Sequence, residues 1–210
     1  ALGASAEETV QNTEQATGIS TDNPSAQKES DGKYETYVSL LKFAGIDISS
    51  QNRDTQVTRL DFAKLLVTLM GENPDVTKLR TKEYFSDMPK SDKESGYANY
   101  VYEKKLMKAE SDGKFNANGA VTEKDIAAIG VKLLGYDKYY AIPDNSDTSQ
   151  YVTAANGLKL FSGLKKSAAD KGLDYEDLAI YLYNIFDTKP VVYENDGAVV
   201  VNKISDSLYM

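Results

Sequence analysis

The sequence has no cysteine, no histidine and no tryptophan among its 210 residues. Without cysteine and histidine the chain has no disulfide, no thiolate nucleophile, no imidazole base and none of the common zinc ligand sets. It also has no apolar run close to the about 18 residues that a membrane-spanning helix needs. We therefore expect no metal, no cofactor and no membrane span.

Positive charge is also in short supply. The chain carries 24 Lys and Arg against 32 Asp and Glu, which gives a net charge of -8. Proteins that bind phosphate backbones need clustered Lys and Arg, because much of their affinity comes from released counterions. The balance of charge predicts that nucleic acid is not a partner.

Residues 1–33 contain no aromatic side chain and are rich in Glu, Gln, Ser, Thr and Ala. Such a segment buries too little apolar surface to offset the entropy of ordering it. We expect a flexible leader. Within it, Ala4, Ser5 and Ala6 have the small-x-small form of a signal-peptidase site, which predicts a signal-peptide remnant and a secreted protein, although an Ala/Ser-rich tail has the same appearance.

The chain repeats itself from Tyr34 onward. Three segments align without gaps, namely residues 37–46 (YVSLLKFAGI), 97–106 (YANYVYEKKL) and 151–160 (YVTAANGLKL). Each is typical of a short helix that ends near its last apolar residue. After a polar loop, a second element recurs at residues 57–62, 121–126 and 173–178.

The second element has the pattern of a helix start. Its first polar residue is Thr58, Thr122 or Asp174, and an aspartate follows three residues later in every copy. This spacing predicts an N-cap and a capping-box partner, and an amphipathic stretch with helical spacing follows each start. Neither helix of a pair buries its apolar face alone, so the three copies should share one core.

These patterns predict a mainly α fold with three helix-loop-helix repeats at about residues 34–72, 84–136 and 140–189, all within 34–189. From Pro190 the pattern changes to two short runs of β-branched residues around a Glu-Asn-Asp-Gly turn. Residues 190–210 should therefore contain a β-hairpin that docks on the helices or begins a further domain.

The second copy resembles the S-layer homology family. Residues 85–89 (FSDMP), 112–119 (DGKFNANG) and 121–125 (VTEKD) follow that family's F-x-D-V-P, P-D-G-x-F-x-P-N and V-T-R-A-E motifs. The resemblance covers about residues 34–190. It implies a pseudo-threefold helical spindle whose grooves bind secondary cell-wall polymer, an anionic glycan, and so anchor a secreted S-layer or other surface protein to the cell wall without catalysis.

Two residues carry the ligand-binding prediction. Arg59 matches the arginine of the V-T-R-A-E motif, where the second and third copies have Glu123 and Tyr175. Its guanidinium at a helix N-terminus is a suitable receptor for a carboxylate, and a solvated surface arginine is the alternative. Gly163 matches a family glycine that lets a ligand approach, and a tight turn is the alternative.

Three other interpretations compete with wall binding. An EF-type calcium loop needs oxygen ligands at alternate positions, and neither register counted back from Glu123 or Asp125 supplies them. Self-assembly with other surface-layer subunits, or a spacer role, is favoured by the arginines missing from two copies. An enzyme has the least support, because the conspicuous carboxylates occupy capping positions.

Overall fold

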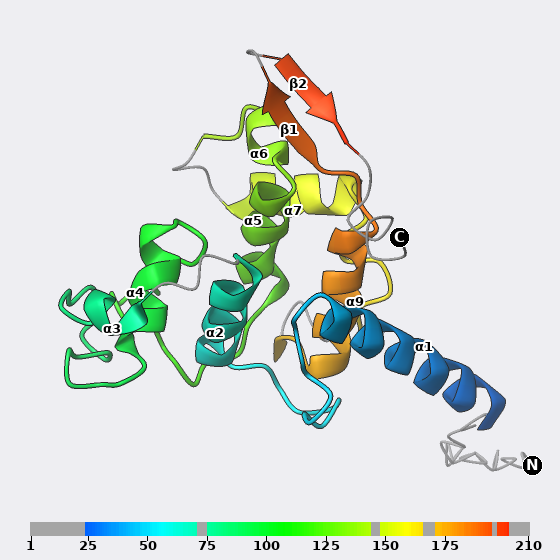
Figure 1. Ribbon diagram of the computed structural model, residues 1–210, viewed down its shortest axis with the longest axis horizontal. Helices are drawn as coiled ribbons and strands as arrows, with labels where there is room; N and C mark the ends of the chain where they lie inside the picture. Colours follow the sequence, from blue (N-terminus) through cyan, green and yellow to red (C-terminus); the bar gives the residue numbers. More distant parts are fainter. Residues whose placement is uncertain (1–23, 71–74, 144–147, 166–170, 195–196, 202–210) are drawn as a thin grey trace, which may run out of the picture.

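The computed structural model describes residues 24–70, 75–143, 148–165, 171–194 and 197–201. Their fold is mainly helical with one antiparallel β-hairpin, as predicted (Figure 1). The first helices of the three copies are α1 (Pro24–Phe43), α4 (Ser95–Glu103) and α7 (Thr148–Gly157), and the second helices are α2 (Arg59–Leu69), α5 (Glu123–Leu133) and α9 (Tyr175–Phe186). Short helices α3 (Val76–Leu79) and α6 (Tyr136–Tyr139) lie between copies, and the hairpin pairs β1 (Val191–Glu194) with β2 (Gly197–Val200).

Helix α1 begins at Pro24, nine residues before the end of the predicted leader at Lys33. Pro24 opens it, and proline is well tolerated in the first helical turn because its missing N–H would be unpaired there. Residues 24–33 are therefore helical, whereas residues 1–23, with Ala4 to Ala6, and residues 202–210 lie outside the described part of the chain.

The three first helices end with the same backbone geometry. Gly45, Lys105 and Lys159 occupy equivalent positions and have φ angles of 88°, 55° and 60°. The next N–H in each copy donates to a carbonyl five residues earlier, in Ile46 to Leu41, Leu106 to Val101 and Leu160 to Ala155, at 2.8–2.9 Å. This is the bond of a Schellman helix end, so the sequence alignment corresponds to a repeated structure.

The predicted N-caps are also present in all three second helices. The side chains of Thr58, Thr122 and Asp174 accept hydrogen bonds from the N–H groups of Asp61, Asp125 and Asp177. In α5 the carboxylate of Asp125 returns a bond to the N–H of Thr122, which completes a capping box.

A ring of backbone hydrogen bonds joins the three copies just before these caps. Val57 donates to the carbonyl of Leu173 at 2.9 Å, Leu173 donates to Val121 at 2.7 Å, and Val121 donates to Val57 at 3.1 Å. All three side chains are buried in one apolar core that all three copies share. The copies therefore form one folded unit.

The hairpin docks on the C-terminal end of α5. The N–H of Val191 donates to the carbonyl of Leu134 at 2.8 Å, and the hydroxyl of Tyr193 donates to the carbonyl of Gly135 at 3.3 Å. Val191 is buried, whereas both faces of β2 are exposed. In the described residues no helix combines the length and apolar character required to cross a membrane.

Candidate ligand-binding groove

Arg59 connects the first copy to the second. It is the first residue of α2, and its side chain is only 2% exposed. Nε donates to the carbonyl of Phe115 at 2.8 Å, one terminal nitrogen donates to Asp125 at 2.7 Å, and the other donates to the carbonyl of Lys108 at 2.7 Å. The guanidinium also lies 5.3 Å from the centre of the Phe115 ring and 3.5 Å from the carboxylate of Glu110. Acceptors of the second copy thus hold the group in place.

The N-terminus of α2 is engaged by the second copy as well. The N–H groups of Arg59 and Leu60 donate to the carbonyls of Gly119 and Ala117 at 2.9 and 3.0 Å. These two N–H groups are therefore already bonded to backbone carbonyls, and an anion at this helix start would need them as donors.

The start of α9 is held in the same way by the first copy. There Tyr175 and Glu176 donate their N–H groups to the carbonyls of Thr55 and Arg53 at 3.1 and 3.0 Å. Arg59 and Tyr175 occupy equivalent positions in their copies, and each lies at a junction between two copies.

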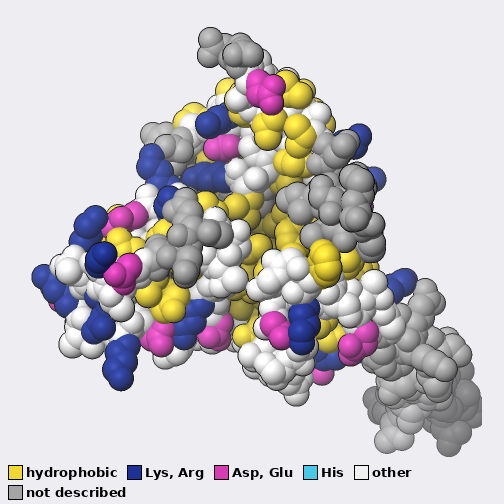
Figure 2. Space-filling model, in the orientation of Figure 1, with side chains coloured by type: hydrophobic (Ala, Val, Ile, Leu, Met, Phe, Trp, Pro, Cys, Tyr) yellow, Lys and Arg dark blue, Asp and Glu magenta, His cyan; other side chains and the backbone are white. Residues whose placement is uncertain are grey.

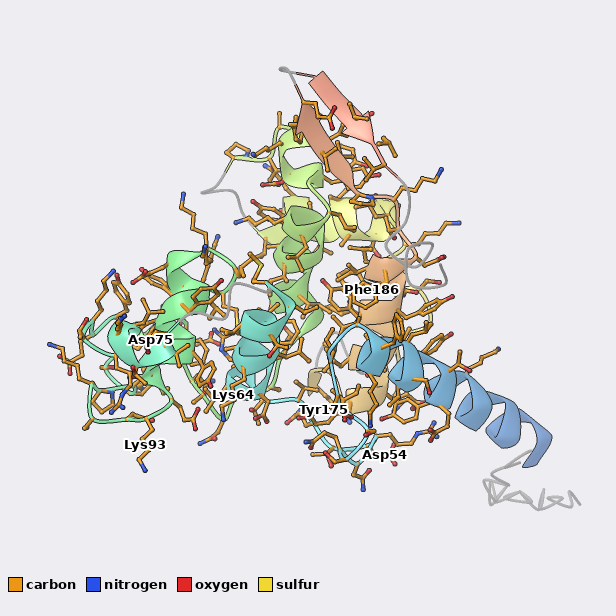
Figure 3. The ribbon with its side chains drawn as sticks, in the orientation of Figure 1. Asp54, Lys64, Asp75, Lys93, Tyr175 and Phe186 are labelled. Atoms are coloured by element: carbon orange, nitrogen blue, oxygen red, sulfur yellow. The ribbon has the colours of Figure 1, made fainter. Side chains whose placement is uncertain are left out.

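Tyr175 fills the junction between the third and first copies. It is 7% exposed and lies at the lower end of α9, close to the loop that carries Asp54 (Figure 3). Burial raises the pKa of its phenol, and the charge of Asp61 raises it further. A hollow of about 220 Å³ beside it includes Asp47, Asp61 and Lys64 in its lining, so this place carries more negative than positive charge.

Ion pairs reinforce this junction. Glu176 pairs with Arg53 of the first copy, and its other oxygen lies 2.9 Å from Nζ of Lys165. Lys165 also pairs with Asp174 at 2.5 Å and lies 3.8 Å from Asp54. Burial lowers the pKa of Lys165, but the hydrogen bonds that its ammonium donates to Asp174 and Glu176 outweigh burial, and the net shift of the pKa is upward.

A basic groove lies at the equivalent place in the second copy. We call it the lysine groove. It has a volume of about 290 Å³, and four lysines, Lys105, Lys108, Lys124 and Lys132, contribute to its lining. Glu110 and Asp125 supply the negative charge, and Thr148 and Tyr151 of α7 form part of one side. In Figure 2, several Lys and Arg side chains gather near α4 and α5.

Two of the lysine-groove side chains are fixed by contacts. Lys132 donates from Nζ to the carbonyl of Lys105 at 2.9 Å, and its ammonium lies 5.5 Å from the centre of the Tyr151 ring. Asp125 accepts from Arg59 and from Thr122, so its charge is already matched inside the protein. The groove therefore presents more ammonium groups than unmatched carboxylates.

Gly163 lies in the turn after α7 with a φ of +89°. That left-handed backbone favours glycine. A Cβ atom added there would lie 3.4 Å from Cγ2 of Ile180, which is an ordinary contact. The structure places Gly163 away from the described lining of the lysine groove, and ligand contact by Gly163 stays a prediction.

The lysine groove was not predicted from the sequence. A signal existed in the alignment of the copies. The positions of Lys105, Lys108, Lys124 and Lys132 correspond to Gly45, Ile48, Leu60 and Thr68 in the first copy, none of which is charged. A gain of four lysines at aligned positions, in a chain of net charge -8, indicates a local function.

The fold and these grooves define a helical-repeat module with no described cluster of three or more acidic side chains placed to hold a metal ion. Residues 84–127, which include α4 and the start of α5, match the S-layer homology domain family. Such domains are non-catalytic modules that generally anchor surface proteins to the cell wall. A search of curated proteins gave no match.

Proposed function

We propose that this protein anchors a bacterial surface or S-layer protein to the cell wall by binding anionic secondary cell-wall polymer in the lysine groove. The observation that carries the proposal is a basic groove on a protein of net charge -8. A concave site with one sign of charge concentrates the opposite charge. A ligand with carboxylates spaced along a chain is matched to four separate ammonium groups.

Arg59 supports this groove from behind. Because it holds the carbonyl of Lys108 and the carboxylate of Asp125, it fixes two parts of the groove lining relative to each other. We propose a positioning role for Arg59; direct contact between its guanidinium and a ligand stays a prediction. We also propose that the ring of three backbone bonds marks the axis of a pseudo-threefold spindle.

The test is a pull-down with purified wall sacculi, intact or stripped of secondary polymer. Wild type should bind the intact walls only. The double variant Lys108→Gln/Lys124→Gln should bind about tenfold more weakly, because two exposed charge contacts of up to about 1 kcal/mol each are lost. Added salt should weaken wild-type binding.

A charge-matched control separates local from global charge. Lys78→Gln/Lys90→Gln removes the same two charges at exposed positions outside the described groove lining, and its binding should match wild type. If both double variants bound equally well, the lysine groove would not be the binding site. If wild type bound stripped walls, the secondary polymer would not be the ligand.

Self-assembly is the second candidate, and one observation favours it. Six of the nine large hydrophobic side chains that are exposed in the described residues lie on α6 and the hairpin, namely Tyr139, Tyr140, Val192, Tyr193, Val199 and Val200. Concentrated exposed apolar surface is typical of interaction sites. If wild type sediments as an oligomer and fails to bind intact walls, assembly replaces anchoring as the function.

A further inference from the structure

Two tyrosines form an exposed pair on the second copy. The chain has 15 tyrosines and no cysteine. Tyr84 lies in the loop between α3 and α4, and Tyr102 lies in the last turn of α4, at the end of the molecule that α3 and α4 form (Figure 1). The ring centres are 5.0 Å apart, and the ring planes make an angle of 44°. Each residue is 39% exposed, so an oxidant in solution can reach both rings.

A buried aromatic residue holds the pair in place. Phe85 is 2% exposed, and the rings of Tyr102 and Tyr84 meet its ring edge-on at 5.2 and 6.4 Å. Phe85 in turn packs on Phe115 of the core, with ring centres 5.2 Å apart. Packing therefore fixes the two tyrosine rings next to each other, which favours reaction within one molecule over reaction between molecules.

A carboxylate accepts the hydroxyl proton of Tyr84 in a hydrogen bond. The hydroxyl of Tyr84 donates to Glu103 at 2.9 Å, and Nζ of Lys82 donates to the same oxygen at 2.7 Å. The hydrogen bond from Lys82 is the main reason why the pKa of Glu103 is lowered, so this carboxylate is ionised at neutral pH. A phenol loses an electron more readily when a base takes its proton in the same step, and Glu103 is placed to act as that base.

We propose that Tyr84 and Tyr102 are a site of oxidative coupling, where a peroxidase using hydrogen peroxide joins the two rings as dityrosine. Each phenol loses one electron and one proton and becomes a phenoxyl radical, and Glu103 receives the proton of Tyr84. The radicals form a carbon–carbon bond between the positions next to the two phenolic carbons. These carbons then release their hydrogens as protons, and each oxygen takes up a proton to restore its phenol. The protein loses two hydrogen atoms, and one hydrogen peroxide is reduced to two waters.

The crosslink supplies a covalent constraint that a chain without cysteine cannot obtain from disulfides. It closes the segment that contains Asp87, whose carboxylate accepts the N–H groups of Phe115 and Asn116 at 2.8 Å. Closing a loop lowers the entropy of the unfolded chain, so the linked protein should be the more stable form. The pair shares no described lining residue with the lysine groove, so this inference does not depend on wall binding.

The test treats the full chain at low concentration with hydrogen peroxide and a haem peroxidase. Wild type should give a monomer that is lighter by two hydrogen atoms, shows dityrosine fluorescence and yields a linked peptide containing residues 84 and 102. Tyr84→Phe and Tyr102→Phe keep the aromatic rings, and each should lose this linked peptide. The linked monomer should unfold at a higher urea concentration than the untreated protein.

Two further variants separate the geometry of this pair from simple exposure. Tyr139 is 54% exposed, and its ring centre lies 5.4 Å from that of Tyr140. Tyr139→Phe removes this more exposed pair and should leave the yield of the linked peptide containing residues 84 and 102 unchanged. Glu103→Gln keeps an acceptor for the Tyr84 hydroxyl but cannot take up its proton, so the initial rate of coupling should fall at least about tenfold.

Three outcomes would overturn the proposal. The first is oxidised wild type without a linked peptide containing residues 84 and 102, whichever other tyrosines react. The second is dityrosine found only in covalent dimers, which would mean that the pair is not arranged for coupling within one molecule. The third is an equal coupling rate in wild type and Glu103→Gln, which would mean that the carboxylate beside Tyr84 does not direct the reaction.

Discussion

At the scale of single residues, Arg59 is a buried charge that is held by several acceptors. Its buried guanidinium bonds to acceptors 49, 56 and 66 positions further along the chain. An arginine fork serves several acceptors at once, whereas a lysine ammonium is a single compact charge. This side chain therefore determines how the first copy sits against the second.

We predict that Arg59→Ala lowers the free energy of unfolding by about 3–5 kcal/mol, because it leaves the acceptors of a buried pair without a partner. Arg59→Lys should recover only part of this loss. Urea denaturation measures both. Lys64→Ala is the control, since its pair with Glu94 is exposed on both sides and should contribute under about 1 kcal/mol. An Arg59→Ala midpoint equal to wild type would contradict the prediction.

The capping residues were predictable from sequence, but the contacts of Arg59 were not. Thr122 and Asp125 are three positions apart, so the sequence alone specifies their hydrogen bonds. The acceptors of Arg59 come from another copy, and no local pattern shows which carbonyl lies beside it. For the same reason the lysines of the groove, spread between positions 105 and 132, were not recognised as one site.

At the scale of helices, the ends of α4 and α7 place a lysine in the left-handed region of backbone conformation. Lys159 adopts a φ of 60°, in the left-handed region that glycine enters without cost and that costs other residues about 1–2 kcal/mol. The equivalent residue in the first copy is Gly45, which has no such cost.

Lys159→Gly should therefore raise the free energy of unfolding by about 1 kcal/mol, and Gly45→Lys should lower it by a similar amount. Thermal or urea unfolding monitored by circular dichroism checks both changes. Asn156→Gly, within the last turn of α7, is the control and should destabilise, because glycine there loses helix propensity. The changes in the free energy of unfolding must have opposite signs for Lys159→Gly and Asn156→Gly, and equal signs would contradict the prediction.

The hairpin depends on close packing against the end of α5. Gly135 has a φ of +75°, and an added Cβ atom would lie 2.1 Å from the carbonyl oxygen of Val191. The sequence predicted the hairpin but not its contact with Gly135, because that contact joins residues that are distant in the chain.

Gly135→Ala should cost more than the about 1–2 kcal/mol of a strained backbone, since β1 must also move. Gly113→Ala is a matched control, because Gly113 has a φ of +78° and open space around it. The difference between the two variants isolates the hairpin contact. Hydrogen exchange at Val191 should accelerate in Gly135→Ala alone, and equal exchange rates in both variants would show that the contact is unimportant.

At the scale of the whole molecule, the closed ring of bonds among Val57, Leu173 and Val121 makes the junctions between copies interdependent. The register of the three copies was visible in the sequence. The ring was not, because its backbone bonds have no side-chain signature and depend on how the copies pack. Loss of one junction should therefore weaken the core that all three share.

The junction between the third and first copies gives a pH test of this arrangement. The pKa of Lys165 is raised above its ordinary 10.5, since burial, which lowers it, is outweighed by the hydrogen bonds that the ammonium donates to Asp174 and Glu176. The folded protein thus keeps this proton at a pH where the unfolded chain has lost it. The stabilisation is complete below pH 10.5 and declines as pH rises toward the folded-state pKa.

Lys165→Met should have a lower free energy of unfolding than wild type at about pH 8, and this difference should narrow as pH rises beyond the ordinary lysine pKa of 10.5. Burial also raises the pKa of Tyr34, Tyr175 and Tyr181, so both proteins lose stability in alkali, and only the difference between them reports on Lys165. Urea titrations at several pH values measure that difference. A constant difference in the free energy of unfolding from pH 8 to about pH 12 would mean that Lys165 stabilises the junction by packing and not by charge.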